Sequence, residues 1–561
     1  MKDPGFEKVF KLYDKGVQFN QQIELYENVE NNENFYIGDQ WKNVQANGNP
    51  TPVFNIIRRV TAFQVSKITA DNFSIQTTPL ASTSKYSLAD VERLCDVVNK
   101  QFAGLIERNK LVSLNREFVR NAAVDGDACL YSWFDPDVET GQDAMGDIRT
   151  EIVENTRVHF GNVNEKDVDR QPYIILQMRW ELEQAKDVAE ANGFDPENIK
   201  PDRDLQGDYY DGLSDSKVTV LTYLTRDKKT GTIWAGKYVQ NGQMEQFKDT
   251  GLKRYPIVWM PWDYVNNCYH GYSLVRQVIP NQVFVNQMFA MVARSLMTTA
   301  FPKVIYDKTR IPHWDGGVGR AIAVNGGGDM NSIAKIMDPA TISPQIGQFI
   351  EMAIDYTQSL MGASDAALGD TRPDNTSAII ALQRASDAPL EMIKNNVYQA
   401  LEDLAFVYLD MMRAYYGKRY VQVKMLSKTQ MANQPLGMSL PEQDFNVIFD
   451  FSILNEVPLS LKVDVGASSY WSEIATVQTL DNLLMQKVIT LDEYLERIPE
   501  GFVSMKQELI DKRRGLNGMN ASGSMGGGVT APMVNQNQQI PVEGGGGYGQ
   551  LQRALNTTGV A

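Results

Sequence analysis

Two pairs of aspartates flank a short strand-like segment, and of all the residues in this sequence they have the clearest potential for chemistry. Asp125 and Asp127 precede the segment, and Asp135 and Asp137 follow it. Because two carboxylates can hold a divalent cation that activates water, one hypothesis is a metal-dependent nuclease or hydrolase that uses all four. The alternative is turn chemistry, since Asp beside Gly or Pro is typical of the turns that bound a strand.

Other motifs of catalysis and cofactor binding are missing from the sequence. It contains no Gly-x-x-x-x-Gly-Lys-Ser/Thr loop, and Gly317-Val318-Gly319 lacks the third glycine of a dinucleotide fingerprint. The chain has three histidines, and the isolated pair Cys268 and His270 supplies fewer ligands than a tetrahedral metal site needs. The sequence therefore predicts no cofactor, no metal and no enzymatic activity, with the hydrolase as the alternative.

The composition predicts an acidic chain with several folded parts. Its 561 residues suggest about three to four domains, and 69 acidic against 54 basic residues give a formal charge of −15, which disfavours tight binding to DNA. The N-terminus lacks the apolar core of a signal peptide, no segment is apolar enough to span a membrane, and the three cysteines are far apart. These features predict a protein that folds in a reducing cell interior.

Hydrophobic periodicity divides the first half of the chain into helices and short strands. Amphipathic helices are predicted over 6–35, 53–68 and 88–123, the last broken near Arg108 and Asn109. A strand-rich middle with a short helix over 181–192 follows. Its predicted strands are 128–134, 148–153, 173–180, 218–224, 232–238 and 256–262.

A different order of elements follows residue 270. Ser273 has the side chain of an N-cap for a charge-poor helix that carries Pro280, and a second helix begins near Pro344 and stops at Gly362. Between them, a small insertion has predicted strands over 303–306 and 320–324. The remaining predictions are a long helix over 376–416 bent at Pro389, strands over 420–425, 445–454 and 459–465, helices over 470–486 and 491–514, and a tail from 515 that is disordered in isolation, with 12 glycines among 47 residues.

Four short motifs accompany this order of parts: Asn32-Glu33-Asn34-Phe35-Tyr36-x-Gly38-Asp39-Gln40-Trp41, Phe118-x-x-x-Ala122-x-x-Asp125-Gly126-Asp127-Ala128, His270-Gly271-Tyr272-Ser273 and Asp464-Val465-Gly466-Ala467. Together with the two helices around a small insertion and the long bent helix, they resemble the portal (head-to-tail connector) proteins of tailed bacteriophages. The resemblance covers nearly all of the chain before the Gly-rich tail.

The resemblance implies an α+β portal fold with an α/β wing, a two-helix stem, a small α/β clip, a long bent wing helix and a helical crown. Its implied boundaries are an N-terminal wing over 1–272, stem helices over 273–297 and 343–361 around a clip over 298–342, a tunnel loop over 362–376, the rest of the wing over 377–469, a crown over 470–514 and a disordered tail over 515–561.

The resemblance also implies a function. Portal proteins form a ring, expected here to be a dodecamer, at one capsid vertex of the virion, and double-stranded DNA passes through it without sequence specificity during packaging and ejection. The implied partners are the major capsid protein, the terminase large subunit and the head-completion adaptor or tail proteins, with assembly in the host cytoplasm and no membrane. Another ring or scaffold component of a virion is a further alternative.

The implied site residues fall into three groups. Asp370, Arg372, Asp374 and Asn375 of the tunnel loop would line the DNA channel. Lys308, Arg310, His313, Trp314 and Arg320 of the clip would bind terminase or adaptor, and Val283, Gln287, Met291, Phe349 and Ile350 would pack the stem helices of neighbouring subunits. Residues 344–417 carry ten acids against four bases, either as an ordinary solvated helix face or as a wall that keeps DNA from sticking.

Overall fold

The computed structural model describes most of the chain. The described residues are 1–70, 73–80, 86–202, 216–299, 304–315, 322–326, 329, 333–336, 344–362, 390–425, 443–465, 470–486 and 488–498. The chain divides into two compact units, Met1–Ser472 and Glu473–Ala561. Helices and antiparallel sheets alternate in the first unit, which confirms the mixed α+β class.

The N-terminal part contains two helices where the periodicity predicted one. The prediction over 6–35 is wrong because Glu24, with a φ of 57°, turns the chain between α1 (Phe6–Gln22) and α2 (Leu25–Ile37). Helix α3 (Ile56–Ile68) starts later than predicted, at Asn55, whose side chain accepts a hydrogen bond from the Arg58 N–H.

The predicted break near Arg108 is confirmed, and it separates α4 (Leu88–Arg108) from α5 (Leu111–Asp125). Ser87 and Asp90 form a capping box at the start of α4. Gly126, with a φ of 106°, ends α5 in the left-handed conformation that glycine adopts most easily.

Two antiparallel sheets follow, and all six predicted strands are present in them. The three-stranded sheet has the order β3-β2-β9, and the five-stranded sheet has the order β4-β5-β6-β7-β8. The short β4 and the largely polar β8 were not predicted. The strands are β2 (Asp127–Asp135), β3 (Asp147–Val153), β4 (Val158–Phe160), β5 (Tyr173–Glu181), β6 (Lys217–Arg226), β7 (Ile233–Val239), β8 (Gly242–Asp249) and β9 (Ile257–Pro261).

Alternate residues of β6 show which helices cover the five-stranded sheet. Leu221 packs in a cluster with Val9 of α1, whereas Val220 packs with Ala185 of α6 (Leu182–Ala191). Because successive strand residues point to opposite faces, α1 and α6 cover opposite faces of this sheet.

The largest hydrophobic core joins α4, α5 and the three-stranded sheet to α11 (Glu391–Met411). Phe102, Phe118 and Tyr408 are completely buried in it. A pair of strands that are distant in sequence, β1 (Phe73–Pro79) and β14 (Leu459–Val465), is antiparallel, and β1 contacts α4. β14 was predicted and β1 was not.

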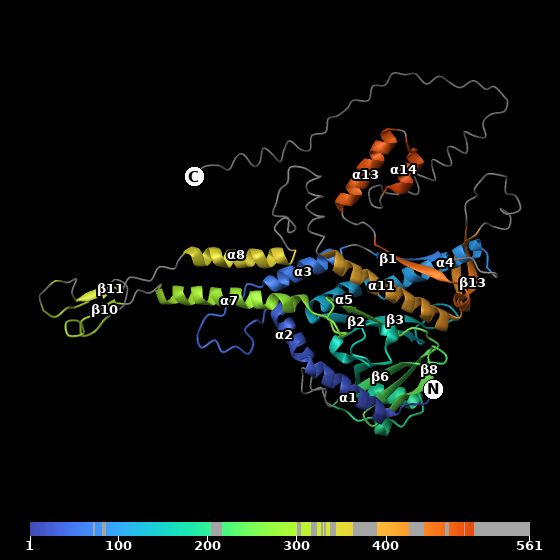
Figure 1. The fold of residues 1–561 in the computed structure, drawn as a ribbon, viewed down its shortest axis with the longest axis horizontal. Helices are drawn as coiled ribbons and strands as arrows, with labels where there is room; N and C mark the ends of the chain where they lie inside the picture. The colour runs from blue at the N-terminus through green and yellow to red at the C-terminus, as the bar shows by residue number, and fades with distance from the viewer. Residues whose placement is uncertain are drawn as a thin grey trace, which may run out of the picture. The chain divides into compact units, whose positions relative to one another are not determined.

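Helices α7 (Leu274–Thr299) and α8 (Pro344–Leu360) lie side by side, and both contact α3 (Figure 1). Both helices were predicted, and Pro280 lies inside α7. Between them, β10 (Val304–Tyr306) pairs with β11 (Ala334–Ile336). The strand predicted over 320–324 is wrong, because residues 322–324 form no strand and the partner of β10 comes later, after the buried Ile333.

Of the helix predicted over 376–416, the structure shows α11 from Glu391 to Met411. A π-helical turn over Met412–Tyr416 continues it. Residues 376–389 lie outside the described residues. β12 (Lys418–Met425) pairs with β13 (Gln443–Asp450). β13 ends earlier than predicted because the Asp450 side chain accepts from the Ser452 N–H and starts a 3-10 turn.

Two further helices lie where helices were predicted near the C-terminus, but the second ends at Arg497 rather than continuing to 514, since Ile498 is not helical. They are α13 (Tyr470–Met485) and α14 (Leu491–Arg497). Residues 499–514 and the Gly-rich tail lie outside the described residues.

Candidate functional site

The four aspartates of the hydrolase hypothesis lie near opposite ends of β2. Asp127 begins the strand and Asp135 ends it, which places them about 26 Å apart at the usual rise per residue. Asp135 lies 3.9 Å from Arg149, and its carboxylate accepts a hydrogen bond from the Asp137 N–H in a turn. The four side chains therefore cannot share a cation. Across the described ranges, no group of three or more His, Cys, Asp or Glu side chains could hold a metal.

Asp127 holds the turn that leads into α7. Its carboxylate accepts a hydrogen bond from the Gly271 N–H at 2.8 Å, and its Oδ2 lies 3.1 Å from Nδ1 of His270. The other ring nitrogen of His270 lies 3.3 Å from Oδ1 of Asn20 in α1. Asp127, His270 and Asn20 are all buried, so these contacts join α1, β2 and the start of α7 in the protein interior.

Glycine is required where these segments touch. A Cβ atom on Gly271 would lie 2.4 Å from the carbonyl oxygen of Gly126 and 2.7 Å from Cβ of Pro261. Gly126 is equally constrained, since its φ is 106° and an added Cβ would lie 3.0 Å from the Gly271 oxygen. The Asp-Gly-Asp and His-Gly motifs therefore form one structural junction between β2 and α7.

A second buried histidine, His159 of β4, lies against α1. A Cβ on Gly16 would come within 2.7 Å of its ring, and Tyr13 packs edge-on against it at 5.1 Å. Neither ring nitrogen has a hydrogen-bond partner. Burial and, to a smaller extent, the neighbouring His270 together lower the pKa of His159 to about 3, so the ring is neutral near pH 7.

Asp125 lies on the α5 side of the same junction. Burial raises the pKa of its carboxyl to about 8, although the nearby Arg120 guanidinium favours the ionised form. Arg120 is itself held by Glu33 of α2, with 2.6 Å between Nη2 and Oε1. Because a protonated carboxyl is a poor ligand for a cation, Asp125 does not support the metal hypothesis.

Ser273 caps α7, as the sequence predicted. Its Oγ accepts a hydrogen bond from the Arg276 N–H at 2.8 Å. The same oxygen accepts from the Asn32 side chain of α2 at 3.0 Å, and Asn32 also donates to the carbonyl of Val124. The cap thus ties the first turn of α7 to both α2 and α5.

A chain of hydrogen bonds between buried amide side chains holds the next turns of α7 against the segments before α3. We call it the buried relay. Oε1 of Gln282 accepts from the Ile56 N–H at the start of α3, and its Nε2 donates to the Phe54 carbonyl and to Asn286. Asn286 then donates to Gln40 at 2.6 Å. Gln282 and Asn286 are almost completely buried, which explains a helix that is poor in charge and rich in amides.

Large apolar side chains on α7 and α8 are exposed to solvent. Met291 is 58% exposed on α7, and Phe349 and Tyr356 are 53% and 63% exposed on α8. Phe284 packs edge-on against Phe349 at 6.0 Å, so the exposed residues of the two helices are continuous. Exposed apolar patches of this kind mark interaction surfaces. We call this surface the outer face; its members are Phe284, Met291, Phe349, Met352, Tyr356 and Leu360.

The five residues predicted to pack between stem helices are placed differently in the protomer. Gln287, Met291 and Phe349 are exposed, Val283 is half-buried, and Ile350 is buried. Three of the five are therefore available to another chain, while Ile350 belongs to the protomer interior.

A hollow of about 300 Å³ lies between α7 and the loop after α2. Ala290, Met291 and Arg294 form its α7 side, and Trp41 and Pro50 are among its loop residues. The Trp41 Nε1 donates to the carbonyl of Pro52, which closes the loop on itself. The hollow borders the outer face at Met291.

Four of the residues predicted to bind terminase or adaptor follow β10 in the chain: Lys308, Arg310, His313 and Trp314. Trp314 stacks on Tyr306 with 5.3 Å between ring centroids, and Arg310 lies 3.8 Å from Asp307. Lys308 and His313 are exposed. Arg320 lies outside the described residues, as do all four predicted channel residues, Asp370, Arg372, Asp374 and Asn375.

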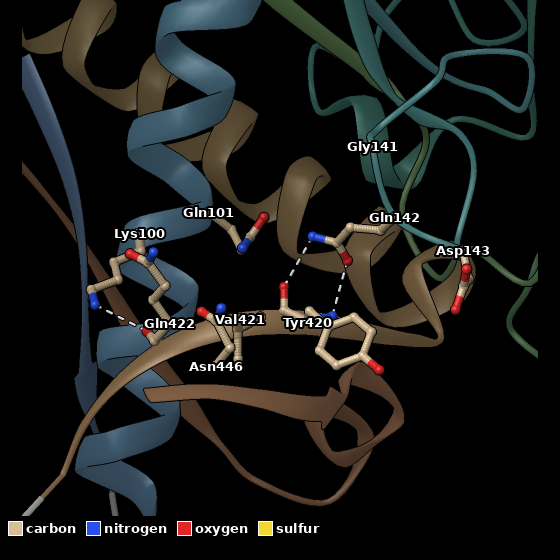
Figure 2. Close-up of a pocket in the computed structure, with 9 residues that line it drawn as sticks. All are labelled: Lys100, Gln101, Gly141, Gln142, Asp143, Tyr420, Val421, Gln422 and Asn446. Atoms are coloured by element: carbon tan, nitrogen blue, oxygen red, sulfur yellow. Dashed lines mark hydrogen bonds between the residues drawn. The ribbon is translucent and has the colours of Figure 1, made fainter. Parts of the chain in front are cut away.

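A polar cavity of about 610 Å³ lies between α4, the β2–β3 loop and the β12–β13 ribbon (Figure 2). Gln142 bridges to β12 by accepting from the Tyr420 N–H and donating to its carbonyl, and Lys100 donates to the carbonyl of Gln422. Its other lining residues include amides and Asp143. None of the predicted site residues lines this cavity. Its lining also does not combine a catalytic nucleophile with a general base.

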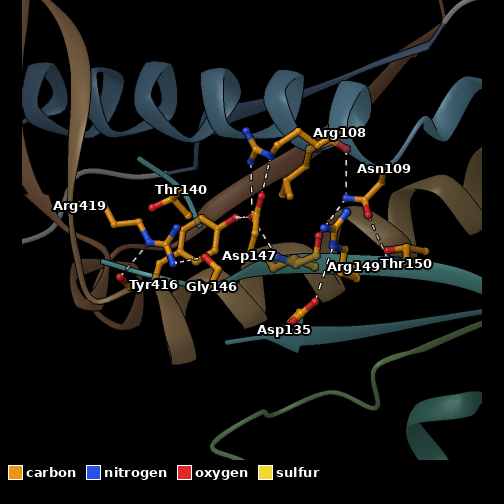
Figure 3. Close-up of polar contacts among 12 residues, drawn as sticks. Arg108, Asn109, Asp135, Thr140, Gly146, Asp147, Arg149, Thr150, Tyr416 and Arg419 are labelled. Atoms are coloured by element: carbon orange, nitrogen blue, oxygen red, sulfur yellow. Dashed lines mark hydrogen bonds and ion pairs between the residues drawn. The ribbon is translucent and has the colours of Figure 1, made fainter. Parts of the chain in front are cut away.

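Beside it, Asp147 is the centre of a buried polar network (Figure 3). Its carboxylate accepts from the Tyr416 hydroxyl at 2.7 Å and lies 2.6 Å from Nε of Arg108. Arg419 stacks on Tyr416 and donates to the carbonyl of Gly146. These contacts join α4, β3, the end of α11 and β12, so the network has a structural role.

The sequence revealed some of these residues and missed others. Its motifs contained Asp127, His270 and Ser273, yet nothing near them in sequence indicated that Asp127 and His270 pair. Asn20 and His159 were missed because they lie in helix and strand patterns with no local signal. Gln282 and Asn286 were visible as amides in an apolar helix, which is the signal that could have identified the buried relay.

Comparison with known proteins gives one match. A family model described as phage P22-like portal protein matches residues 142–444, a range that contains the five-stranded sheet, α7, α8, α11 and β12. No curated protein matches the chain. None of the helices in the described ranges is long and apolar enough to cross a membrane.

Proposed function

This chain belongs to the phage P22-like portal protein family, and we propose that it forms a ring-shaped channel through which double-stranded DNA is packaged and later ejected. The family gives the chain a portal role and implies a place at the capsid vertex of the virion. Portal proteins are generally structural rather than enzymatic. The contacts of Asp127 and Asp147, which hold segments of the fold together, agree with such a role.

The outer face carries this proposal. A subunit that remained alone in water would gain nothing from leaving Met291, Phe349 and Tyr356 more than half exposed. Repetition of the subunit around a ring would bury such a face at every contact. Helices α7 and α8 would then be the two stem helices, and β10 and β11 part of the clip between them.

The other parts follow from this assignment. The sheets and α11 would form the wing and α13 and α14 part of the crown, with residues 362–376 as a tunnel loop carrying Asp370, Arg372, Asp374 and Asn375. Lys308, Arg310, His313, Trp314 and Arg320 of the clip would dock the terminase and then the adaptor or tail proteins. The net negative charge of the chain supports a channel that binds the DNA duplex weakly, so that the duplex can slide through it.

Light scattering after size exclusion, with negative-stain microscopy, tests the proposal. We expect rings with a central hole and about twelve subunits, whereas a stable monomer at all concentrations and salt conditions would contradict it. Met291→Glu places a charge on the outer face and should abolish ring formation without loss of helix content. Met145→Glu is the matched control, since Met145 is 55% exposed but lies in the β2–β3 loop.

A further inference from the structure

We infer that the outer edge of β12 is a docking site for an extended segment of a partner protein, which adds a third strand to the β12–β13 ribbon. In the described part of the chain this ribbon has two strands, and a sheet of two strands is only marginally stable without further packing. The β12 edge lines the polar cavity of about 610 Å³ (Figure 2). The inference concerns the surface of a single subunit and does not depend on the proposed ring.

The backbone of β12 points hydrogen-bonding groups into this cavity at every second residue. The N–H and the carbonyl of Tyr420 both bond to the Gln142 side chain, and the carbonyl of Gln422 accepts from Lys100. Because successive residues of a paired strand direct these groups to opposite edges, Tyr420 and Gln422 face the cavity while Val421 faces β13. The edge therefore offers the donors and acceptors that a further strand would use.

The Gln142 side chain shows which chemical group fits this edge. Its carboxamide accepts from the Tyr420 N–H at 2.9 Å and donates to the Tyr420 carbonyl at 3.1 Å. A residue of a neighbouring antiparallel strand would make these same two bonds with Tyr420. Since Gln142 is exposed in the β2–β3 loop, its side chain can turn aside into solvent when a strand replaces it.

The cavity has room for a short strand. Its volume equals that of about 20 liquid water molecules. Tyr420, Val421 and Gln422 line it, so a partner segment of about five residues would cover them and extend one residue beyond at each end. Its backbone would pair with β12, and alternate side chains would point into the cavity.

The lining also specifies the side chains of the partner. Lys100 lies beside Gln422 at one end of the cavity, and Asp143 lies at the opposite end, beyond Tyr420 (Figure 2). Charge complementarity calls for an acidic residue near Lys100 and a basic residue near Asp143. Between these ends the lining is uncharged, which suits an uncharged polar residue; its other members are Gln101, Gly141, Gln142, Val421 and Asn446.

The exposed ring of Tyr420 adds a further requirement. Its side chain is 48% exposed, whereas Arg419 and Val421 are buried. Residues directly opposite each other in a sheet point to the same face, so a β-branched side chain opposite Tyr420 would cover part of its ring. The residue opposite Val421 would point towards α4.

These requirements define a probe, the peptide Glu-Thr-Gln-Val-Lys blocked at both ends. When it runs antiparallel to β12, its Glu lies at the Lys100 end, its Val lies opposite Tyr420 and its Lys lies at the Asp143 end. We expect the fluorescently labelled peptide to bind the full chain with a dissociation constant of about 1 mM or lower, measured by fluorescence anisotropy.

Binding should depend on the backbone of the edge. Gln142→Ala removes the side chain that occupies it, so the peptide should bind about fivefold tighter or more. Gln18→Ala, at an exposed position of α1, is the matched control and should leave binding unchanged. The same peptide N-methylated at its second and fourth residues keeps its side chains but loses the N–H groups that would donate to Gln422 and Tyr420, and its binding should weaken about tenfold or more.

Binding should also depend on the charge at one end. Lys100→Glu should weaken binding of the peptide about tenfold, and a second peptide, Lys-Thr-Gln-Val-Lys, should bind this variant better than it binds the unchanged chain. If both peptides respond to Lys100→Glu in the same way, the partner assigned to the edge is wrong.

The remaining outcomes overturn the inference directly. Equal binding of the N-methylated peptide would show that recognition does not use the β12 edge, and so would a lack of binding to both the unchanged chain and Gln142→Ala. Peptide binding that disappears when subunits assemble would show that a second copy of the chain covers the edge instead of a partner protein. Rings without peptide binding would overturn this inference alone, and peptide binding without rings would overturn only the proposed function.

Discussion

The base of α7 and the outer face of α7 and α8 belong to the same helices but have opposite chemistry. At the base, Asp127, Gln282 and Asn286 are buried polar groups, and each is hydrogen-bonded to a segment distant in sequence. On the outer face, apolar side chains such as Tyr356 are exposed. The base therefore orients the helix pair within the subunit, while the outer face is left for contacts beyond it. Substitutions should separate the two roles, since the base controls stability and the face controls assembly.

The largest expected effect is at the base, from Gly271→Ala. The new Cβ would lie 2.4 Å from the Gly126 oxygen, and we expect a loss of about 4 kcal/mol in the free energy of unfolding because two backbone segments must move apart. Chemical denaturation of the monomeric fraction measures this loss. Gly347→Ala on α8 is the control: nothing lies within 4 Å of its Cβ position, and alanine should stabilise that helix by about 0.5–1 kcal/mol. Equal stability of both variants would show that the junction is not tightly packed.

Gln282→Leu should have the next largest effect. It removes the side-chain partner of the Ile56 N–H, the Phe54 carbonyl and Oδ1 of Asn286, although the Ile56 N–H keeps its bond to the Phe54 carbonyl. We expect a loss of about 2–3 kcal/mol, chiefly because the buried Oδ1 of Asn286 is left unsatisfied. Gln287→Leu makes the same change at an exposed position of α7 and should alter the stability of the subunit by less than about 0.5 kcal/mol. Similar unfolding midpoints for the two variants would contradict a buried relay.

His159 predicts a dependence of stability on pH. Its pKa is about 3 when folded and about 6.5 when unfolded, so the unfolded chain binds the extra proton between these values. Stability should be complete above pH 6.5 and fall as the pH drops towards 3, with about 2 kcal/mol lost at pH 5. His159→Phe should remove this loss, since neither ring nitrogen is hydrogen-bonded. His313→Phe, at an exposed position, should leave the acid dependence unchanged, and the reverse result would exclude His159 as its origin.

The smallest effect on the subunit is expected on the outer face. Tyr356→Ser changes a side chain that is 63% exposed, so the free energy of unfolding should shift by less than about 0.5 kcal/mol. Ring assembly in the same sample should nevertheless weaken. Tyr264→Ser, where the side chain is 50% exposed and lies in a loop outside α7 and α8, should leave ring assembly unchanged and cost at most the contact with Lys166. A large loss of stability from Tyr356→Ser would show that the face serves the subunit itself.

Local signals explain which parts of the fold were predictable. Ser87 marks the start of α4 and Pro344 the start of α8, and both helices were predicted because caps and periodicity act over a few residues. β1 was not predicted, since its exposed residues are polar and its partner β14 is distant in the chain. The one-helix prediction over 6–35 failed because the periodicity continues through Glu24 while the backbone does not.

The site shows the same limit. The two aspartate pairs resembled a metal site in sequence, but the length of β2 separates them, and three-dimensional contacts assign Asp127 to His270. The family could be predicted because the order of helices and the short motifs can be recognised directly in the amino-acid sequence. The sequence could not predict which amide side chains of α7 are buried, because their burial depends on how α2 and α3 pack against α7.

The pairing of β1 with β14 also has a consequence for how the chain is made. Phe73 pairs with Val465, so β1 leaves the ribosome roughly 20 to 80 seconds before its partner at the usual rate of synthesis. During that interval, the apolar side of β1 and the unpaired backbone of both its edges are available to other chains. Slow translation or many ribosomes on one message should therefore favour aggregation of nascent chains, and the yield of assembled protein will depend on how quickly residues 459–465 emerge.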